Sequence, residues 1–180
     1  QLIERLLEEN DLYNREELVE CVQDTANISD YLRAENATFF PYEGLLFPAF
    51  YDVPERDIAS ECLMVQRMSQ EFDRRYDALL DEHGLPPEAT ELGLDTYDIV
   101  IIASLIEKEV KVPEERPLVS RVIWNRLLAG WKLGVDASVC YLPEISCQGL
   151  LQSQLDDTSN AWNTRANFGL PPTPIAAPGE

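Results

Sequence analysis

The sequence has little that could hold a metal ion or cross a membrane. It contains a single histidine, His83, and its four cysteines include no Cys-x-x-Cys pair, so zinc-ligand spacing is absent. No run of 18 apolar residues occurs, and no signal peptide opens the chain. The first residue is Gln1 rather than methionine, which indicates a piece of a longer protein. We expect no metal and no other cofactor.

Basic residues are also scarce, with 14 Lys and Arg against 33 Asp and Glu, and the formal net charge is -19 at pH 7. Such a chain is repelled by nucleic acid phosphates and by anionic lipid, so neither is an expected partner. The hydrophobic fraction of 45% is ordinary for a globular protein. A chain of 180 residues is long enough for one domain with a core and an added lobe.

The four cysteines are Cys21, Cys62, Cys140 and Cys147. They are too few for the dense framework of a small disulfide protein. Cys140 and Cys147 are close enough in sequence to bridge, but spacing alone does not establish a bond. We expect free, half-buried thiols.

Apolar residues at helical spacing predict a mostly helical, α+β protein. Helices are expected over 1–9, 15–23, 29–36, 56–83, 97–110, 114–129 and 147–156, and short strands over 39–53 and 133–141. The segment 84–95 opens on a glycine and two prolines and is expected to be a linker. It divides an N-terminal helical lobe, 1–92, from a C-terminal lobe, 93–180. The tail 159–180 is rich in proline and is expected to be an ordered loop.

An aromatic loop at 37–54 belongs to the N-terminal lobe. Its side chains either line a groove, because aromatic faces stack on sugar rings, or fill the core beneath the loop. The side chains concerned are Phe39, Phe40, Leu45, Leu46, Phe47, Phe50 and Tyr51.

The most hydrophobic helix, 97–110, ends in two carboxylates, Glu107 and Glu109. Residues two apart point to nearly opposite faces of a helix, so these two do not form a facing acid/base pair. If Glu107 points inward, burial and the negative end of the helix dipole disfavour its charged form, as a general acid requires. The alternative is a solvated helix end.

Several motifs follow one another along the chain. They are Glu43–Pro48 (EGLLFP), Ala103–Glu109 (ASLIEKE), Glu115-Arg116, Trp124–Leu127 (WNRL), Leu133–Tyr141 (LGVDASVCY), Asn163-Thr164 and Gly169–Gly179 (GLPPTPIAAPG). Together, and in this order, they resemble the endolytic peptidoglycan transglycosylases of the YceG-like family.

The resemblance implies a bacterial envelope enzyme that cuts glycan strands internally between N-acetylmuramic acid and N-acetylglucosamine. The product ends in a 1,6-anhydro sugar, and no water is consumed. The family's catalytic glutamate is the first of the E-K-E motif, which is Glu107 here. Most glycosidases use two carboxylates. In this reaction the 6-hydroxyl of the sugar attacks the anomeric carbon, so one carboxylate suffices.

The resemblance also implies the surroundings of the reaction. The partners are peptidoglycan strands, with cell-wall synthases as a second class. The place of action is the extracytoplasmic face of the membrane, where the intact protein has an N-terminal membrane helix that this chain lacks. Relative to the family, the chain is truncated at both ends.

The polar motif residues are expected to orient the sugar in a glycan-binding groove of the C-terminal, catalytic lobe, lined by the short strands. They are Asn125, Asp136, Ser138, Tyr141, Asn163 and Thr164. Glu109 and Arg116 are expected to form a supporting ion pair, or to be structural.

The chain departs from the family pattern at four places. Gly134-Val135 replaces Gln and then Ser or Thr, Ala137-Ser138 replaces Pro-Thr, Trp162 to Arg165 replaces Tyr-Asn-Thr-Tyr, and Thr173 replaces Gly. Two other interpretations therefore remain open. One is a catalytically weak or inactive glycan-binding module of the same fold, and the other is an acidic helical interaction domain.

Overall fold

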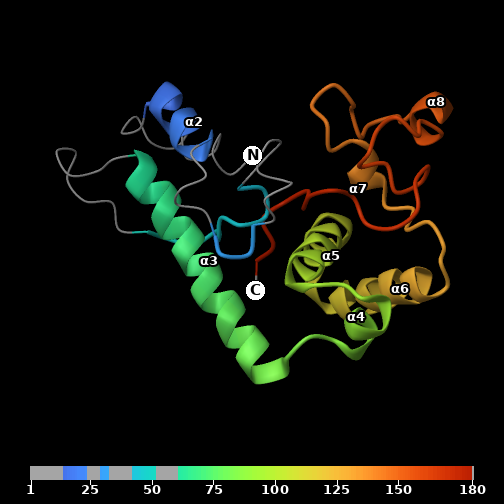
Figure 1. The fold of residues 1–180 in the computed structure, drawn as a ribbon. Coiled ribbons are helices and arrows are strands. Elements are labelled where there is room, and N and C mark those ends of the chain that lie inside the picture. The colour runs from blue at the N-terminus through green and yellow to red at the C-terminus, as the bar shows by residue number, and fades with distance from the viewer. Residues whose placement is uncertain (1–13, 24–28, 33–41, 52–60, 180) are drawn as a thin grey trace. The chain divides into compact units, whose positions relative to one another are not determined.

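The computed structural model describes residues 14–23, 29–32, 42–51 and 61–179, and every regular element in these ranges is a helix (Figure 1). The helices are α2 (Arg15–Gln23), α3 (Glu61–His83), α4 (Pro87–Leu92), α5 (Thr96–Glu109), the 3-10 helix η3 (Pro113–Glu115), α6 (Arg116–Leu128), α7 (Asp136–Val139) and α8 (Gln152–Leu155). None of these described helices is long and apolar enough to span a bilayer.

The chain divides into two compact units. Unit 1 is Gln1–Gly84 with Gly179–Glu180, and unit 2 is Leu85–Pro178. The helices expected at 15–23, 97–110 and 114–129 are confirmed to within about two residues at each end. The helix expected at 1–9 lies outside the described residues, as do residues 33–36 and 56–60 of two others.

In unit 1, α2 packs against the first half of α3. Leu18 of α2 is fully buried, in a cluster with Met64, Val65 and Met68 of α3. A disulfide joins Cys21 of α2 to the second residue of α3, with Cα atoms 4.9 Å apart. Burial of one apolar face and one covalent bond therefore hold the two helices together.

The described part of the aromatic segment, 42–51, is irregular and packs on α3. Leu45, Leu46 and Phe47 are buried, and the Phe47 backbone N–H donates to the carbonyl of Met68 at 3.1 Å. The Arg75 guanidinium lies 4.3 Å from the centre of the Phe47 ring. These side chains fill the core, so the groove expected here does not include them. Phe39 and Phe40 lie outside the described residues.

Unit 2 begins with a helix, where the sequence predicts a linker at 84–95. Pro87 occupies the first turn of α4, where its missing N–H costs nothing, and Gly93 ends the helix in a left-handed conformation at φ 67°. Ala89 of this helix is fully buried in the unit 2 core.

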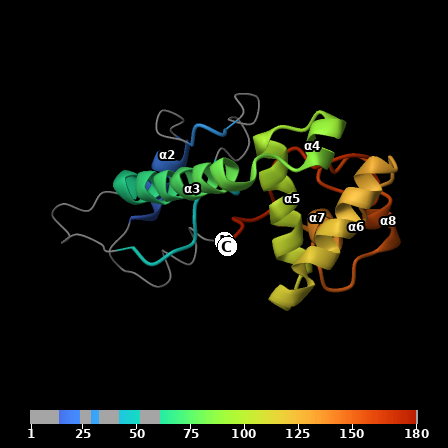
Figure 2. The same cartoon turned by 90° about the horizontal axis from the view of Figure 1, so that it is seen from below.

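The central element of unit 2 is α5, which lies beside α6 in both views and also packs on α7 (Figures 1 and 2). Asp95 and Asp98 form a reciprocal capping box at its start, with N···O distances of 3.1 and 3.0 Å. The fully buried Ser104 hydroxyl accepts a hydrogen bond from the Ile175 N–H at 3.0 Å. The proline-rich tail is thereby fixed to α5, and the expectation of an ordered tail is confirmed.

The short strand expected at 133–141 is wrong. Leu133 and Val135 are buried and Gly134 between them is not. This alternation of buried and accessible residues is typical of an extended segment, but it ends at Val135. Val135 and Val139 are both buried and lie four residues apart, which places them on one helical face. The chain therefore turns into α7 at Asp136. Residues 42–51 also form no strand, and 39–41 and 52–53 lie outside the described residues.

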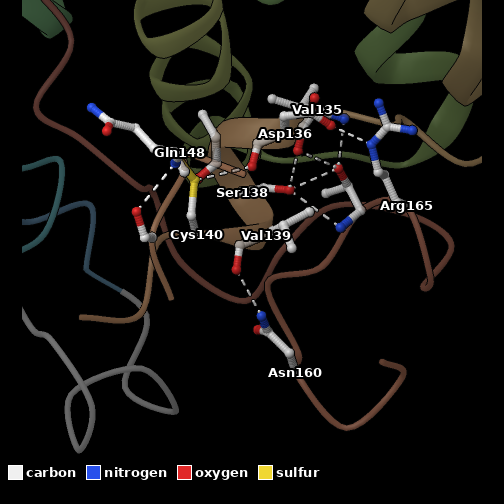
Figure 3. Close-up of a disulfide and its surroundings, with 12 residues drawn as sticks. Val135, Asp136, Ser138, Val139, Cys140, Gln148, Asn160 and Arg165 are labelled. Carbon is white, nitrogen blue, oxygen red and sulfur yellow. Dashed lines mark hydrogen bonds and ion pairs between the residues drawn. A yellow bond between two sulfur atoms is a disulfide. The ribbon is translucent and has the colours of Figure 1, made fainter. Parts of the chain in front are cut away.

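The expectation of free thiols is also wrong, because all four cysteines are paired. Cys140, directly after α7, bonds to Cys147 with Cα atoms 5.3 Å apart, and Figure 3 shows this disulfide and its surroundings. The other bond closes a separation of 41 residues, which the fold brings together and sequence spacing cannot indicate.

Candidate functional site

Glu107 lies in the last turn of α5, and the chain then reverses through η3 into α6. The first residue of α6, Arg116, donates from Nη2 to Glu107 Oε2 at 3.1 Å, and the two side chains are 38% and 35% exposed. The carboxylate is therefore half-exposed and ion-paired, which lies between the buried acid and the solvated helix end that the sequence left open. Arg116 pairs with Glu107, and an additional pair between Arg116 and Glu109 stays a prediction.

A second carboxylate–guanidinium pair stands at the start of α7. Arg165 Nε donates to Asp136 Oδ1, and Figure 3 shows the guanidinium directed at this carboxylate. The bond to Asp136 raises the pKa of Arg165, and the nearby charge of Glu109 adds to the effect. Glu109 is thus near the second pair. Arg165 was not among the predicted site residues, although its place in the family's Tyr-Asn-Thr-Tyr motif could have indicated it.

Ser138 and Thr164, which the sequence predicted to orient a sugar, are buried instead, at 0% and 2% exposed. The Val135 N–H donates to Thr164 Oγ1 at 3.0 Å, and the Thr164 N–H donates to Ser138 Oγ at 3.2 Å. Their hydroxyls lie 2.8 Å apart. Figure 3 shows Val135 and Ser138, two members of this network, next to Asp136. The two side chains hold the start of α7 against residue 164, which positions Asp136 beside Arg165.

Asn163 is likewise buried, at 0% exposed. Its Nδ2 donates to the carbonyls of Gln154, Leu155 and Asp157 at 2.9, 3.2 and 2.9 Å. Its Oδ1 accepts hydrogen bonds from the backbone N–H groups of Arg165 and Ala166, at 3.0 and 3.1 Å. All the polar capacity of this amide is used inside the protein, so its contribution is to fix the loop that carries Arg165.

The remaining predicted residues are accessible. Asn125 is exposed on α6, Asp136 is 53% exposed, and Tyr141 is half-buried. The Tyr141 ring packs on Trp162 with centroids 5.3 Å apart and planes 36° apart. Trp162 Nε1 in turn donates to Thr173 Oγ1 at 2.9 Å. Two departures from the family pattern, Trp162 and Thr173, therefore support each other in the core.

The departure at Gly134 has a local cause. Gly134 has φ 65° and donates its N–H to the Thr164 carbonyl at 3.0 Å. A Cβ there would stand 3.0 Å from Arg126 Nη1, whose guanidinium donates to the Leu133 carbonyl. The glutamine of the family pattern would be strained in this backbone, both by its conformation and by Arg126.

Chemically, the site offers half-exposed carboxylates beside guanidinium groups and half-exposed hydrogen-bonding side chains. Within the described ranges, no three histidine, cysteine or carboxylate side chains are grouped so that they could hold a metal ion. A carboxyl beside an arginine can give up a proton and be stabilised afterwards as the anion. The arrangement suits proton transfer to and from a polar substrate.

The fold belongs to a class of bacterial proteins of known structure. The crystal structure of a YceG-like protein from Listeria monocytogenes matches 93% of this chain and 52% of that chain, with a TM-score of 0.68 and 25% sequence identity. The YceG-like family model matches residues 2–180, and the chain belongs to this family.

Two relatives carry the name endolytic murein transglycosylase. One, from Bacillus subtilis (strain 168), is 29% identical over 141 residues, which are 77% of this chain and 36% of that protein. The other, from Streptococcus pneumoniae serotype 2, is 27% identical over 147 residues, which are 76% of this chain and 24% of that protein. The chain therefore spans about a quarter to a third of the length of these relatives.

Proposed function

We propose that the protein is a peptidoglycan lytic transglycosylase that cleaves glycan strands internally, with Glu107 as its single acid/base. One observation carries the proposal: Glu107, the first glutamate of the E-K-E motif, lies half-exposed in the last turn of α5 and is paired with Arg116. The relatives' names support the reaction class.

The proposed reaction has two proton transfers. Glu107 first donates its proton to the glycosidic oxygen as the bond from that oxygen to the anomeric carbon of N-acetylmuramic acid breaks. The 6-hydroxyl oxygen of the same sugar then bonds to that carbon, and Glu107 takes up the hydroxyl proton. The acid is restored, and the 1,6-anhydro ring forms without water. Arg116, 3.1 Å from Glu107, stabilises the carboxylate between the two transfers.

The accessible and the buried motif residues have different proposed roles. Asn125, Asp136 and Tyr141 contact the sugar. Ser138, Asn163 and Thr164 act as positioning residues, because their polar atoms bond within the protein. Arg165 orients Asp136 through their ion pair.

The proposed place of action is the extracytoplasmic side of a bacterial membrane. Disulfides persist in oxidising compartments and are rare in reducing ones. Both pairs of cysteines are bonded here. This supports the same location as the substrate, the cell wall.

The test is digestion of purified peptidoglycan, with 1,6-anhydro muropeptides measured by mass spectrometry. Glu107→Gln should lower their rate of formation by about a hundredfold or more, because it removes the general acid. Glu88→Gln is the matched control, since Glu88 also makes a 3.1 Å ion pair in unit 2, with Arg121. It should digest like the wild type. Unchanged digestion by Glu107→Gln would refute the proposed role.

The same experiment addresses the second candidate, a catalytically inactive glycan-binding module. That candidate is favoured by the altered residues at 134–138 and 162–165. It predicts that wild type and Glu107→Gln both bind peptidoglycan and that neither forms anhydro products. Absence of binding would leave an acidic helical interaction domain.

A further inference from the structure

Two segments of unit 2 lie alongside each other: 131–136, which is irregular up to the start of α7 at Asp136, and the irregular segment 164–168. The Gly134 N–H donates to the Thr164 carbonyl at 3.0 Å, and Asp136 pairs with Arg165. At the other end, Lys132 Nζ lies 5.1 Å from the centre of the Phe168 ring. The two segments therefore connect the Asp136–Arg165 pair to a lysine–phenylalanine pair through one continuous stretch of protein.

Phe168 is a large apolar residue that is 71% exposed. A cation within about 6 Å of an aromatic ring is attracted to its face. Lys132 therefore covers part of Phe168 and leaves the rest of the ring open to solvent. An exposed aromatic ring next to an ammonium group offers a ligand an apolar face and a positive charge together.

We propose that Lys132 and Phe168 form an additional subsite for the peptidoglycan strand. One sugar ring lies with its C–H face on Phe168, and the Lys132 ammonium pairs with a carboxylate borne by an N-acetylmuramic acid unit or its peptide. The inference rests on the proposed function for the identity of the strand. It adds a binding site outside the predicted set of site residues.

Lys132 provides a positive charge at the proposed subsite. The chain as a whole has a formal net charge of -19, which repels an anionic polymer. The paired segments nevertheless carry Lys132 and Arg165 on accessible positions. A carboxylate-bearing strand that is bound at the Asp136–Arg165 pair and continues along these segments reaches a second cation at Lys132. An uncharged chitin oligosaccharide has the same sugar ring faces but lacks the carboxylates, so the two contributions can be separated.

The test measures binding without turnover, in the Glu107→Gln background of the full chain. Trp131, which adjoins Lys132, is 66% exposed, whereas Trp124 and Trp162 are each 8% exposed. Its fluorescence therefore reports ligands at the subsite, and calorimetry gives an independent affinity. The ligands are soluble, carboxylate-bearing glycan strands from peptidoglycan and chitin oligosaccharides of equal length.

Phe168→Leu should weaken binding of both ligands by about two- to tenfold, because the aromatic face is lost while an apolar side chain remains. Phe168→Tyr keeps the face and should bind like the parent. Lys132→Gln should weaken binding of the carboxylate-bearing strand more than that of the chitin oligosaccharide, and Lys132→Arg should restore it. Leu118→Ala, which trims another apolar side chain that is 70% exposed, should change neither affinity.

The outcomes separate this inference from the proposed function. Equal affinities of Phe168→Leu and its parent for both ligands would overturn the subsite, as would the absence of binding by the parent. If binding depends on Phe168 while the wild-type chain, with Glu107 intact, forms no anhydro product, the subsite is supported and the transglycosylase is refuted. If the wild type forms anhydro products, Glu107→Gln does not, and Phe168→Leu leaves binding unchanged, then the transglycosylase is supported and the subsite is refuted.

Discussion

Replacing Asn163 by alanine should destabilise unit 2 instead of acting mainly on substrate affinity. The substitution removes five hydrogen bonds between the side chain and the backbone. A hydrogen bond contributes about 0.5–1.5 kcal/mol net, and a buried group left without a partner costs more. The Ala166 N–H keeps the Asn163 carbonyl as an acceptor at 3.2 Å. The Gln154 and Leu155 residues are half-buried, so water can reach part of the site. We expect a loss of about 3 kcal/mol.

The assay is urea unfolding followed by tryptophan fluorescence. All three tryptophans lie in unit 2, so the signal reports that unit alone. Asn125→Ala is the matched control: the same side chain is removed from an exposed position on α6, and the change should stay within about 0.5 kcal/mol. If Asn163→Ala unfolds at the same urea concentration as the wild type but binds glycan more weakly, the assignment of Asn163 to a positioning role is refuted.

Three other substitutions test local features. Gly134→Ala should cost about 1–2 kcal/mol, because its positive φ and the 3.0 Å approach of Arg126 both oppose a Cβ; fluorescence-detected unfolding measures it. Replacing Cys140 and Cys147 by serine should lower unit 2 stability by about 2 kcal/mol in the same assay, because a short loop is opened. Two arginines hold the pKa of Glu71 at about 2, below its usual 4.5. The stability that Glu71 provides should therefore be complete above about pH 4.5 and fall toward pH 2, and Glu71→Gln should remove this contribution to the pH dependence of unfolding, measured by circular dichroism of the full chain.

Helices were predictable where the apolar pattern was long. The apolar run of α5 is buried on the side that packs against α6 and α7, and its period is clear in the sequence. The short helix α4 is not expected from the sequence, because two adjacent prolines are typical of a break, although a proline in the first turn is compatible with a helix. α7 was missed because Leu133 and Val135 alternate as in a strand until the chain turns at Asp136.

The site was predictable only as a set of residue types. The motif order makes Glu107 and Asp136 candidates, but a motif does not distinguish a side chain that touches a ligand from one that supports the backbone. Ser138 and Thr164 bond to each other and to backbone groups, which depends on two segments 26 residues apart in sequence. The partners of Arg116 and of the cysteines depend in the same way on tertiary contacts, for which the sequence alone carries no local signal.

The ion pair at Glu107 constrains any mechanism that uses this residue as an acid. In the structure the side chain is held by Arg116, and an arginine remains charged at every pH at which a protein is folded. In the proposed reaction Glu107 is the acid of the first step and the base of the second, and the carboxylate formed between the two steps lies beside this permanent positive charge. A mechanism at Glu107 therefore has to account for Arg116 as well.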